Sequence, residues 1–275
     1  GFQVFSLLYK NKQWGEIRDD KVIFKSPLDG SRHELSPEKS IQIQFALGVD
    51  MMVCLDDCPP NDFSRADLEV AVQRTINWAK RSKAEYLKQI KKRKISAAKR
   101  PLLFAVIQGG ADLDLRKDCA TELVAIGFDG YGFGGRPVDK NGNFLAEVLR
   151  VTANFIPPNA LRFALGIGTP EDIRRCTYLG WDMFDCVIPS REGRHGKLYL
   201  ANGQKYKTIN INNAKFARDF LPINKNSQIK ELSSQTRAFL HHLFRLNEPL
   251  GQRLASLNNL EFYQTQLKKL QNNKR

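Results

Sequence analysis

Long apolar runs are missing from this sequence. In its 275 residues, no stretch approaches the ~18 apolar residues that a membrane-spanning helix needs. No basic segment followed by an apolar one opens the chain, as a secretion signal would. We therefore expect no membrane partner and a cytoplasmic location. The chain begins at Gly1, without Met and inside a strand-like pattern, so we expect a fragment or a truncated gene product.

Cysteine and histidine are also scarce. The odd number of cysteines and the lack of any Cys-x-x-Cys pair argue against a disulfide framework, and with so few histidines they offer no obvious zinc site. We expect reduced thiols. The sequence contains no P-loop, which excludes the common nucleoside-triphosphate site. The sequence contains four histidines and five cysteines, and the cysteines are Cys54, Cys58, Cys119, Cys176 and Cys186.

Positive charge is abundant and unevenly distributed. The net charge is +14, and residues 80–100 carry ten Lys and Arg against one acid, while residues 201–275 carry thirteen against four. Two basic regions on a slightly acidic remainder indicate a polyanionic partner, although solvated helix faces would give the same composition. For Lys91–Lys94 we expect a solvated loop that touches RNA phosphates.

The first 47 residues predict a β-hairpin appendage followed by a helix. We expect strands at Val4–Tyr9, Gly15–Ile17 and Val22–Phe24, separated by short turn signals. Pro37 then opens a helix that ends near Leu47, with Ser36 as its N-cap.

Five strand–helix alternations follow, which predict a parallel sheet in either a barrel or a doubly wound fold. The strands are expected at Met51–Leu55, Leu102–Ile107, Gly130–Phe133, Phe163–Leu165 and Met183–Phe184, and the helices between them at Ser64–Ile90, Leu113–Ile126, Phe144–Phe155 and from Thr169 onward. Beyond Pro189 the alternation breaks. Residues 190–235 are polar and basic, and helices are expected at Arg237–Phe244 and Leu254–Leu270.

Polar and glycine residues directly follow these strands, and in a barrel they would share the rim where active sites lie. Together, a carboxylate, an amide and backbone N–H groups can bind the edge of a nitrogen-rich base such as guanine. A second carboxylate can attack an anomeric carbon. The simpler interpretation of a strand-end Asp is a helix N-cap. The residues concerned are Asp56, Gln108, Gly134, Gly135, Gly166 and Asp185.

Several short strings sharpen this interpretation because they occur in a fixed order. Together they resemble the tRNA-guanine transglycosylase (queuine tRNA-ribosyltransferase) family along the whole chain. The strings are Gly1-Phe2-Gln3-Val4, Leu55-Asp56-Asp57-Cys58-Pro59-Pro60, Ile107-Gln108-Gly109-Gly110, Gly130-Tyr131-Gly132-Phe133-Gly134-Gly135, Gly168-Thr169-Pro170-Glu171-Asp172, Asp182 to Arg191, and Arg237 to Phe244.

The resemblance implies a (β/α)8 TIM barrel whose first strands are missing here, with an inserted C-terminal subdomain. It implies three parts: residues 1–189 as the barrel portion with its hairpin, 190–258 as an RNA-contacting subdomain, and 259–275 as a helix that packs on the barrel. The implied reaction exchanges guanine at the tRNA wobble position for a 7-deazaguanine (preQ1-like) base in queuosine synthesis. The resemblance also points to a homodimer.

Individual roles are carried over by position. The resemblance makes Asp185 the nucleophile that attacks C1′ of the ribose. The base would be held by Asp56, Gln108 and the Gly135 backbone, with Cys58, Val138, Arg136 and Phe163 around it. The tRNA backbone would contact Arg191, Arg194 and Lys197.

The sequence also departs from the family's pattern. The family's acid–base Asp lies upstream of the string that begins here at Gly1. Its zinc ligands correspond to Ser227, Ile229, Leu232 and Asn258, so we expect no metal cofactor, with Ile229 and Leu232 burying apolar surface instead. Arg136 replaces an apolar residue and Lys140 replaces Glu, which places positive charge near a cationic base.

Two other functions remain open at this point. A non-catalytic tRNA-binding paralogue or accessory subunit would explain the lost zinc ligands and the changes at Arg136 and Lys140. A pure binding subunit, however, has no chemical need for Asp185. A carbohydrate-active barrel hydrolase could also use two carboxylates, but the basic regions count against it.

Overall fold

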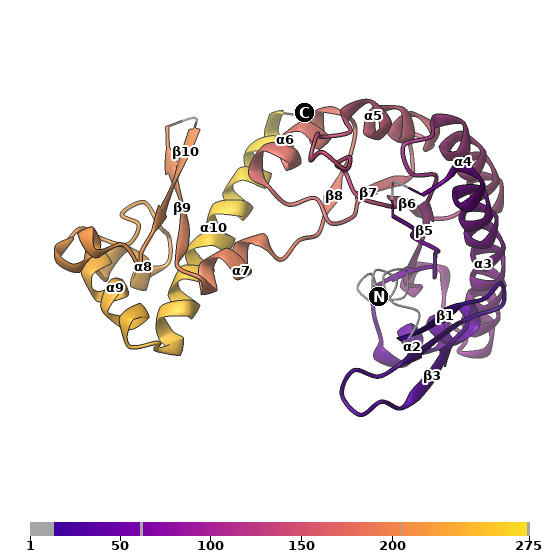
Figure 1. Ribbon diagram of the computed structural model, residues 1–275, viewed down its shortest axis with the longest axis horizontal. Coiled ribbons are helices and arrows are strands. Elements are labelled where there is room, and N and C mark those ends of the chain that lie inside the picture. Colours follow the sequence, from indigo (N-terminus) through magenta and orange to yellow (C-terminus); the bar gives the residue numbers. More distant parts are fainter. Residues whose placement is uncertain (1–13, 61–62, 204, 274–275) are drawn as a thin grey trace. The chain divides into compact units, whose positions relative to one another are not determined.

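The structure is a computed structural model that describes residues 14–60, 63–203 and 205–273. The chain divides into two compact units (Figure 1). The first contains residues 1–167 and 175–184, and the second contains residues 168–174 and 185–275. The predicted strand Val4–Tyr9 lies outside the described residues. Among the described residues, no helix is both long and apolar enough to cross a membrane.

The first unit opens with a small antiparallel sheet instead of a simple hairpin. Its strands are β1 (Gly15–Ile17), β2 (Val22–Lys25) and β3 (Arg32–Leu35), in the order β1-β2-β3. Val22 packs with Leu55 and with Trp78 of the following long helix. The Trp78 indole N–H donates to the Asp19 carbonyl at 2.6 Å, which anchors the sheet to that helix.

A curled five-stranded parallel sheet forms the centre of the first unit (Figure 1). Each strand pairs with the next strand along the chain, in the order β4-β5-β6-β7-β8, as in a (β/α)8 barrel. This confirms the predicted barrel-type α/β fold, of which the described strands make part. The strands are β4 (Met51–Val53), β5 (Leu102–Ile107), β6 (Gly130–Phe133), β7 (Leu161–Ala164) and β8 (Met183–Phe184).

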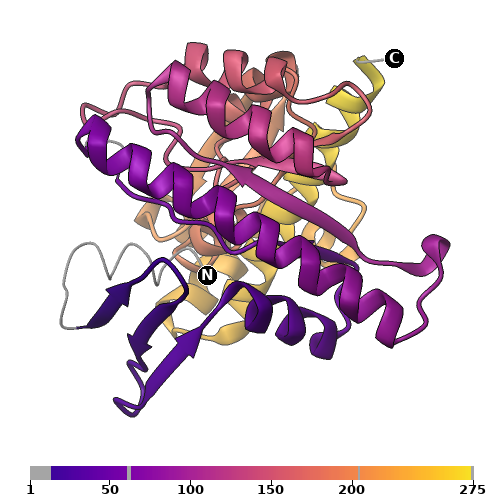
Figure 2. The same cartoon turned by 90° about the vertical axis from the view of Figure 1, so that its right-hand side faces the viewer.

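Helices connect successive strands and lie outside the sheet (Figures 1 and 2). Figure 2 shows α2 and the long α3 side by side. The predicted stripe of α3, from Leu68 to Tyr86, is buried. The helices are α2 (Pro37–Leu47), α3 (Arg65–Lys92), α4 (Leu113–Ile126) and α5 (Ala146–Phe155), with a short 3-10 helix η2 (Ala97–Lys99) before β5. The helix α6 (Pro170–Tyr178) is divided between the two units.

Local capping chemistry explains where these helices begin. The Ser36 hydroxyl accepts a hydrogen bond from the Lys39 N–H at the start of α2, as predicted. Ser64 does the same for α3. The predicted helix at Phe144 starts two residues late, because Phe144 pairs with Val138 in a β-bridge.

The prediction of a loop at the basic run Lys91–Lys94 is wrong for its first half. Lys91 and Lys92 form the last turn of α3, where positive side chains suit the negative end of the helix dipole. Only Arg93 and Lys94 leave the helix, and Lys94 has a positive φ of 53°.

The second unit is built around the C-terminal helix α10 (Pro249–Asn273), which packs on α7 (Ile188–Arg194) and on a β-hairpin (Figure 1). The hairpin, β9 (Lys197–Asn202) with β10 (Lys205–Asn210), was not predicted. Its residues Leu198 and Leu200 are buried. Polar residues dominate β10, so its sequence lacks the clear alternation of apolar and polar residues that predicts a strand. The remaining elements are η3 (Ala214–Arg218), α8 (Lys230–Ser234) and α9 (Arg237–Arg245).

Candidate active site

Two predicted base-binding side chains meet at the carboxyl ends of β4 and β5. Gln108 is the residue after β5 and is 1% exposed. Its Nε2 donates a hydrogen bond of 2.7 Å to Oδ2 of Asp56, which follows β4. One donor of the amide is thereby used to orient the carboxylate, and the second carboxylate oxygen is held in a defined direction. The pair thus offers a ligand a carboxylate that accepts hydrogen bonds, with the Gln108 amide beside it.

Burial changes the acidity of this pair. Desolvation raises the pKa of Asp56 to about 6, although the hydrogen bond from Gln108 acts in the opposite direction and the neighbouring Asp57 raises it further. Asp56 is thus mostly ionised at neutral pH and can accept hydrogen bonds from ring and exocyclic N–H groups.

The glycine pair after β6 completes this part of the site. A Cβ atom on Gly134 would lie 2.3 Å from Nε2 of Gln108, so only glycine lets the amide lie over this strand end. Gly135 has a φ of +97°, which side chains disfavour. Burial raises the pKa of the Cys58 thiol to about 12, partly offset by hydrogen bonding from Gln108 and the Gly135 backbone. Cys58 is therefore a neutral neighbour of Asp56 and Gln108.

A buried ion pair, which the sequence analysis did not predict, supports the loop that carries Asp56. Asp57 is fully buried, and its Oδ2 lies 2.5 Å from Nη1 of Arg74 on α3. Arg74 also pairs with Asp19 at 2.9 Å. The Asp57 N–H donates to the Thr75 hydroxyl at 3.0 Å. These contacts hold the Asp56–Asp57 backbone against α3.

The remaining predicted base-pocket residues come from β7 and from the segment that follows β6. Phe163 in β7 is 7% exposed and makes an edge-to-face contact with Phe104, with ring centroids 6.3 Å apart. Arg136 is exposed directly after the glycine pair, and Val138 is half-buried in its bridge with Phe144. Lys140 is exposed in the turn that follows. The base-binding roles of these residues stay predictions.

Asp185, the predicted nucleophile, is the first residue of the longer segment of the second unit, residues 185–275. It follows directly on the last residue of β8 and is exposed. Gly168 and Cys186 lie in close contact within the same unit, since a Cβ atom on Gly168 would lie 2.2 Å from the Cys186 Cβ. The segment that holds Asp185 is therefore anchored to the Gly168 loop by tight packing.

The predicted tRNA-binding residues lie on α7 and at the start of β9. Arg191 and Arg194 are exposed in the last turn of α7. Lys197 pairs with Glu192 at 3.2 Å and is 43% exposed. Arg191 lies 3.7 Å from the same carboxylate. At this exposure such pairs contribute little to stability, so both cations can exchange Glu192 for a phosphate.

Two features of α10 hold α7 in place. A Cβ atom on Gly193 would lie 2.8 Å from the Ser256 backbone, so the two helices approach closely. The fully buried Asn259 donates to the Pro189 and Lys197 carbonyls at 3.0 and 2.8 Å and accepts from the Tyr199 N–H at 3.0 Å. Asn259 was missed because Asn inside a helix usually indicates solvent exposure.

The four positions that match the family's zinc ligands do not fit a metal. Leu232 is fully buried in the apolar core of this unit, and Ile229 packs on it. The Ser227 hydroxyl donates to Glu261 at 2.6 Å, and the Asn258 amide bonds to Asn224 and to the Tyr199 carbonyl. Across residues 14–60, 63–203 and 205–273, no group of three or more His, Cys, Asp or Glu side chains could hold a metal.

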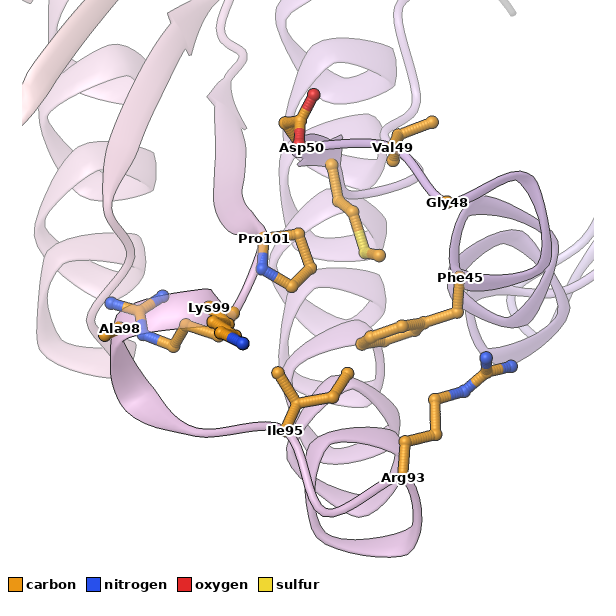
Figure 3. A pocket seen from close by; sticks show the side chains of 11 residues that line it. Phe45, Gly48, Val49, Asp50, Arg93, Ile95, Ala98, Lys99 and Pro101 are labelled. Atoms are coloured by element: carbon orange, nitrogen blue, oxygen red, sulfur yellow. The ribbon is translucent and has the colours of Figure 1, made fainter.

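A separate cavity lies at the opposite end of the parallel strands (Figure 3). Its volume is about 460 Å³, and its lining includes Phe45, Met52, Arg93, Lys99 and Pro101. Asp50 and Pro101 precede β4 and β5, so the cavity is at their amino ends. The predicted phosphate-binding run at Lys91–Lys94 adjoins this cavity through Arg93. It is therefore at the other end of the sheet from Asp56 and Gln108.

The chain is similar to known proteins along its whole length. The queuine tRNA-ribosyltransferase family model matches residues 1–273. The queuine tRNA-ribosyltransferase of Halothermothrix orenii is 38% identical over 270 residues, which cover 98% of this chain and 68% of that protein. The proteins of the same name from Methylacidiphilum infernorum and Symbiobacterium thermophilum are 39% and 38% identical. The chain covers 69% and 61% of their lengths, respectively. The chain therefore belongs to the queuine tRNA-ribosyltransferase family.

Proposed function

We propose that this chain forms the larger part of a tRNA-guanine transglycosylase that exchanges guanine at the wobble position of tRNA for a 7-deazaguanine base, in queuosine synthesis. The observation that carries the proposal is the Asp56–Gln108 pair, joined at 2.7 Å beside the Gly134–Gly135 turn. Family membership supports it, because the relatives are named for a transfer of the same kind.

The donor and acceptor pattern of the pair suits guanine and its 7-deaza analogues. The ionised Asp56 accepts from the ring N–H and the exocyclic amino group. Gln108 and the Gly135 N–H donate to the carbonyl oxygen of the ligand. A base with an amino group in place of the 6-oxo group would place its own N–H donors against the donors of Gln108 and Gly135. Such a base binds more weakly, because buried donors stay unpaired.

Asp185 carries the covalent step in this proposal. Its carboxylate attacks C1′ of the ribose, the N-glycosidic bond breaks, and guanine leaves with the electron pair and takes up a proton. The 7-deaza base then loses its N9 proton, attacks the same carbon and displaces the Asp185 carboxylate. In the family pattern, an acid–base Asp handles these two protons.

The RNA is held on the second unit. Arg191 and Arg194 in the last turn of α7, with Lys197 at the start of β9, present three cations within seven residues. They follow Asp185 closely in the chain, so they can bind the phosphates next to the nucleotide under attack. Binding through phosphates predicts a strong dependence on salt concentration.

The proposal includes a folded second unit without zinc. The residues at the four matching positions offer two apolar side chains and two polar groups that already have hydrogen-bond partners. No step of the proposed reaction involves the metal.

The base that enters is proposed to be preQ1-like. Cys58 and Val138 match the pattern implied for that base, whereas the charges of Arg136 and Lys140 oppose a cationic aminomethyl group. A neutral 7-deazaguanine without the amino group is therefore the informative competitor. A lower KM for preQ1 than for that competitor supports the assignment, and the reverse order overturns it.

Trapping of the covalent intermediate tests the nucleophile. The protein is incubated with tRNA that carries guanine at position 34 and with excess 9-deazaguanine or preQ1, then run on a denaturing gel. We expect a protein–tRNA adduct from the wild type and none from Asp185→Ala. Asp182→Ala is the matched control, because Asp182 precedes β8 and Asp185 follows it. An adduct that persists in Asp185→Ala would show that another group attacks.

A non-catalytic tRNA-binding subunit is the second candidate. The exposed Arg136 next to the glycine pair favours it, as does the replacement of all four matched zinc positions. This alternative predicts salt-dependent tRNA binding without any adduct. Tight tRNA binding by the wild type, with no trapping by either base, would support it against the catalytic proposal.

A further inference from the structure

A buried arginine underlies the base-binding strand ends. Arg116 in α4 has no exposed surface. Its guanidinium donates to three backbone carbonyls: Nε to Gly110 at 2.8 Å, Nη1 to Ile107 at 3.0 Å and Nη2 to Gly134 at 2.8 Å. It also stacks on the Phe133 ring, 3.9 Å from the centroid. Burial lowers the pKa of Arg116 to about 10, so the group stays protonated at neutral pH.

The three carbonyls belong to the turns on which the candidate site is built. Ile107 and Gly110 flank Gln108, and Gly134 precedes Gly135. A single cation therefore joins the turn after β5 to the turn after β6. Gly109 makes room for it, because a Cβ atom there would lie 2.9 Å from Cγ of Arg116. A Lys at this position has no planar fork and cannot reach three carbonyls in the same way.

The contact with Gly134 has a consequence on the other side of the peptide group. The Gly134 carbonyl and the Gly135 N–H are the two ends of one planar trans peptide, so they point in opposite directions. Because the carbonyl points to Arg116, the N–H points away from α4. A charged donor on the carbonyl also polarises the peptide, which strengthens the N–H as a donor.

We propose that Arg116 is a positioning residue for base recognition, which orients the Gly134–Gly135 peptide and strengthens the Gly135 N–H toward the carbonyl oxygen of the base. This inference rests on the proposed function, in which that N–H binds the base. It assigns Arg116 no contact with the base. The Gly134–Gly135 peptide is preorganised for the base, because the Arg116 cation already holds its carbonyl before any ligand enters.

The test compares Arg116→Lys and Arg116→Met with the matched variants Arg100→Lys and Arg100→Met. Arg100 is partly buried, whereas Arg116 is fully buried, and it pairs with Asp129 and Tyr86. It precedes β5 and so lies at the amino ends of the strands. Both pairs of variants are expected to lower stability. Binding of free 9-deazaguanine is measured by calorimetry, beside the thermal unfolding midpoint and the KM values for base and tRNA.

We expect both Arg116 variants that fold to lose about 10- to 100-fold in base affinity, with KM for tRNA changed by less than about threefold, by analogy with a single charge-assisted hydrogen bond. The Arg100 variants should keep the base affinity of the wild type. Equal base affinity in folded Arg116→Lys, Arg116→Met and wild type would overturn the inference. If the wild type binds no base at all, the proposed function fails first.

A second measurement does not depend on binding of the base. In protein labelled with 15N-glycine, the Gly135 amide proton of the wild type should resonate downfield of its position in Arg116→Lys, because loss of the charged partner reduces the polarisation of the peptide. An unchanged Gly135 shift, in a folded variant whose Gly110 and Gly134 signals move, would show that Arg116 has only a structural role.

Discussion

Asp56 shows how a residue that is proposed to bind the base can lower the stability of the fold. Its carboxylate is buried enough that its pKa rises to about 6, which means that keeping the charge destabilises the folded protein. Gln108 offsets part of that cost through its hydrogen bond. Such a cost is typical of groups that are arranged for a ligand and not for the fold.

Asp56→Asn should therefore stabilise the protein at alkaline pH while weakening base binding. With a raised folded-state pKa, the favourable contribution of Asp56 is fully present below pH ~4 and is lost as the pH rises through about 6. The substitution removes that loss, so we expect a gain of about 1–3 kcal/mol at pH 8 and none at pH 4. Urea unfolding at both pH values measures the difference. A gain that is the same at pH 4 and pH 8 would contradict desolvation of the carboxylate as its cause.

At the scale of elements, the contact between α7 and α10 positions the residues proposed to bind RNA. Gly193 lies where the two helices touch, and Asn259 links the start of α7 and the start of β9 to α10. The helix α7 has only seven residues, so its position depends on its packing against α10. Arg191 and Arg194 project from this helix.

Gly193→Ala provides a test in which two effects have opposite signs. Helix propensity alone would stabilise the variant by about 1 kcal/mol. The added Cβ would lie 2.8 Å from the Ser256 backbone, so we expect a net loss of about 1–3 kcal/mol and weaker tRNA binding. Urea unfolding and a tRNA titration measure the two effects.

Gly142→Ala is the control for that variant. Its Cβ would meet nothing within 4 Å, but its φ of +83° adds backbone strain. It should lower stability without changing tRNA affinity. Stabilisation of Gly193→Ala would show that α7 tolerates a larger separation from α10.

At the scale of the whole molecule, the second unit has an apolar core at positions that the sequence analysis matched to zinc ligands. Leu232 is fully buried among Leu198, Ile211 and Leu240. The Ser227–Glu261 hydrogen bond joins the segment before α8 to α10. Burial and hydrogen bonding thus supply the long-range links that a metal would otherwise make.

We expect chelation to leave the stability of this protein unchanged. Overnight dialysis against EDTA should shift the thermal midpoint by less than about 1 °C, whereas Leu232→Ala should cost about 2–5 kcal/mol. Metal analysis by atomic emission accompanies the unfolding curves. One equivalent of zinc per chain, together with a lower midpoint after chelation, would contradict a metal-free fold.

Much of the first unit followed from local patterns. Ser36, Ser64 and the alternation of apolar runs with polar strand ends predicted the capped helices and the parallel sheet, because these signals act within a few residues. The β9–β10 hairpin was missed because its outer strand is polar in sequence, and only its pairing with β9 and packing on α10 make it a strand.

Residue types and their order along the chain were sufficient to select Asp56, Gln108, Gly135 and Asp185 as candidates and to indicate the family. The 2.7 Å contact between Asp56 and Gln108 required the tertiary structure, as did the buried fork of Arg116 and the anchoring of α7 by Asn259. Local signals report on backbone preferences and polarity. A charged or polar side chain in the interior is defined by partners that lie far from it in sequence, and these meet only when the sheet and helices have packed.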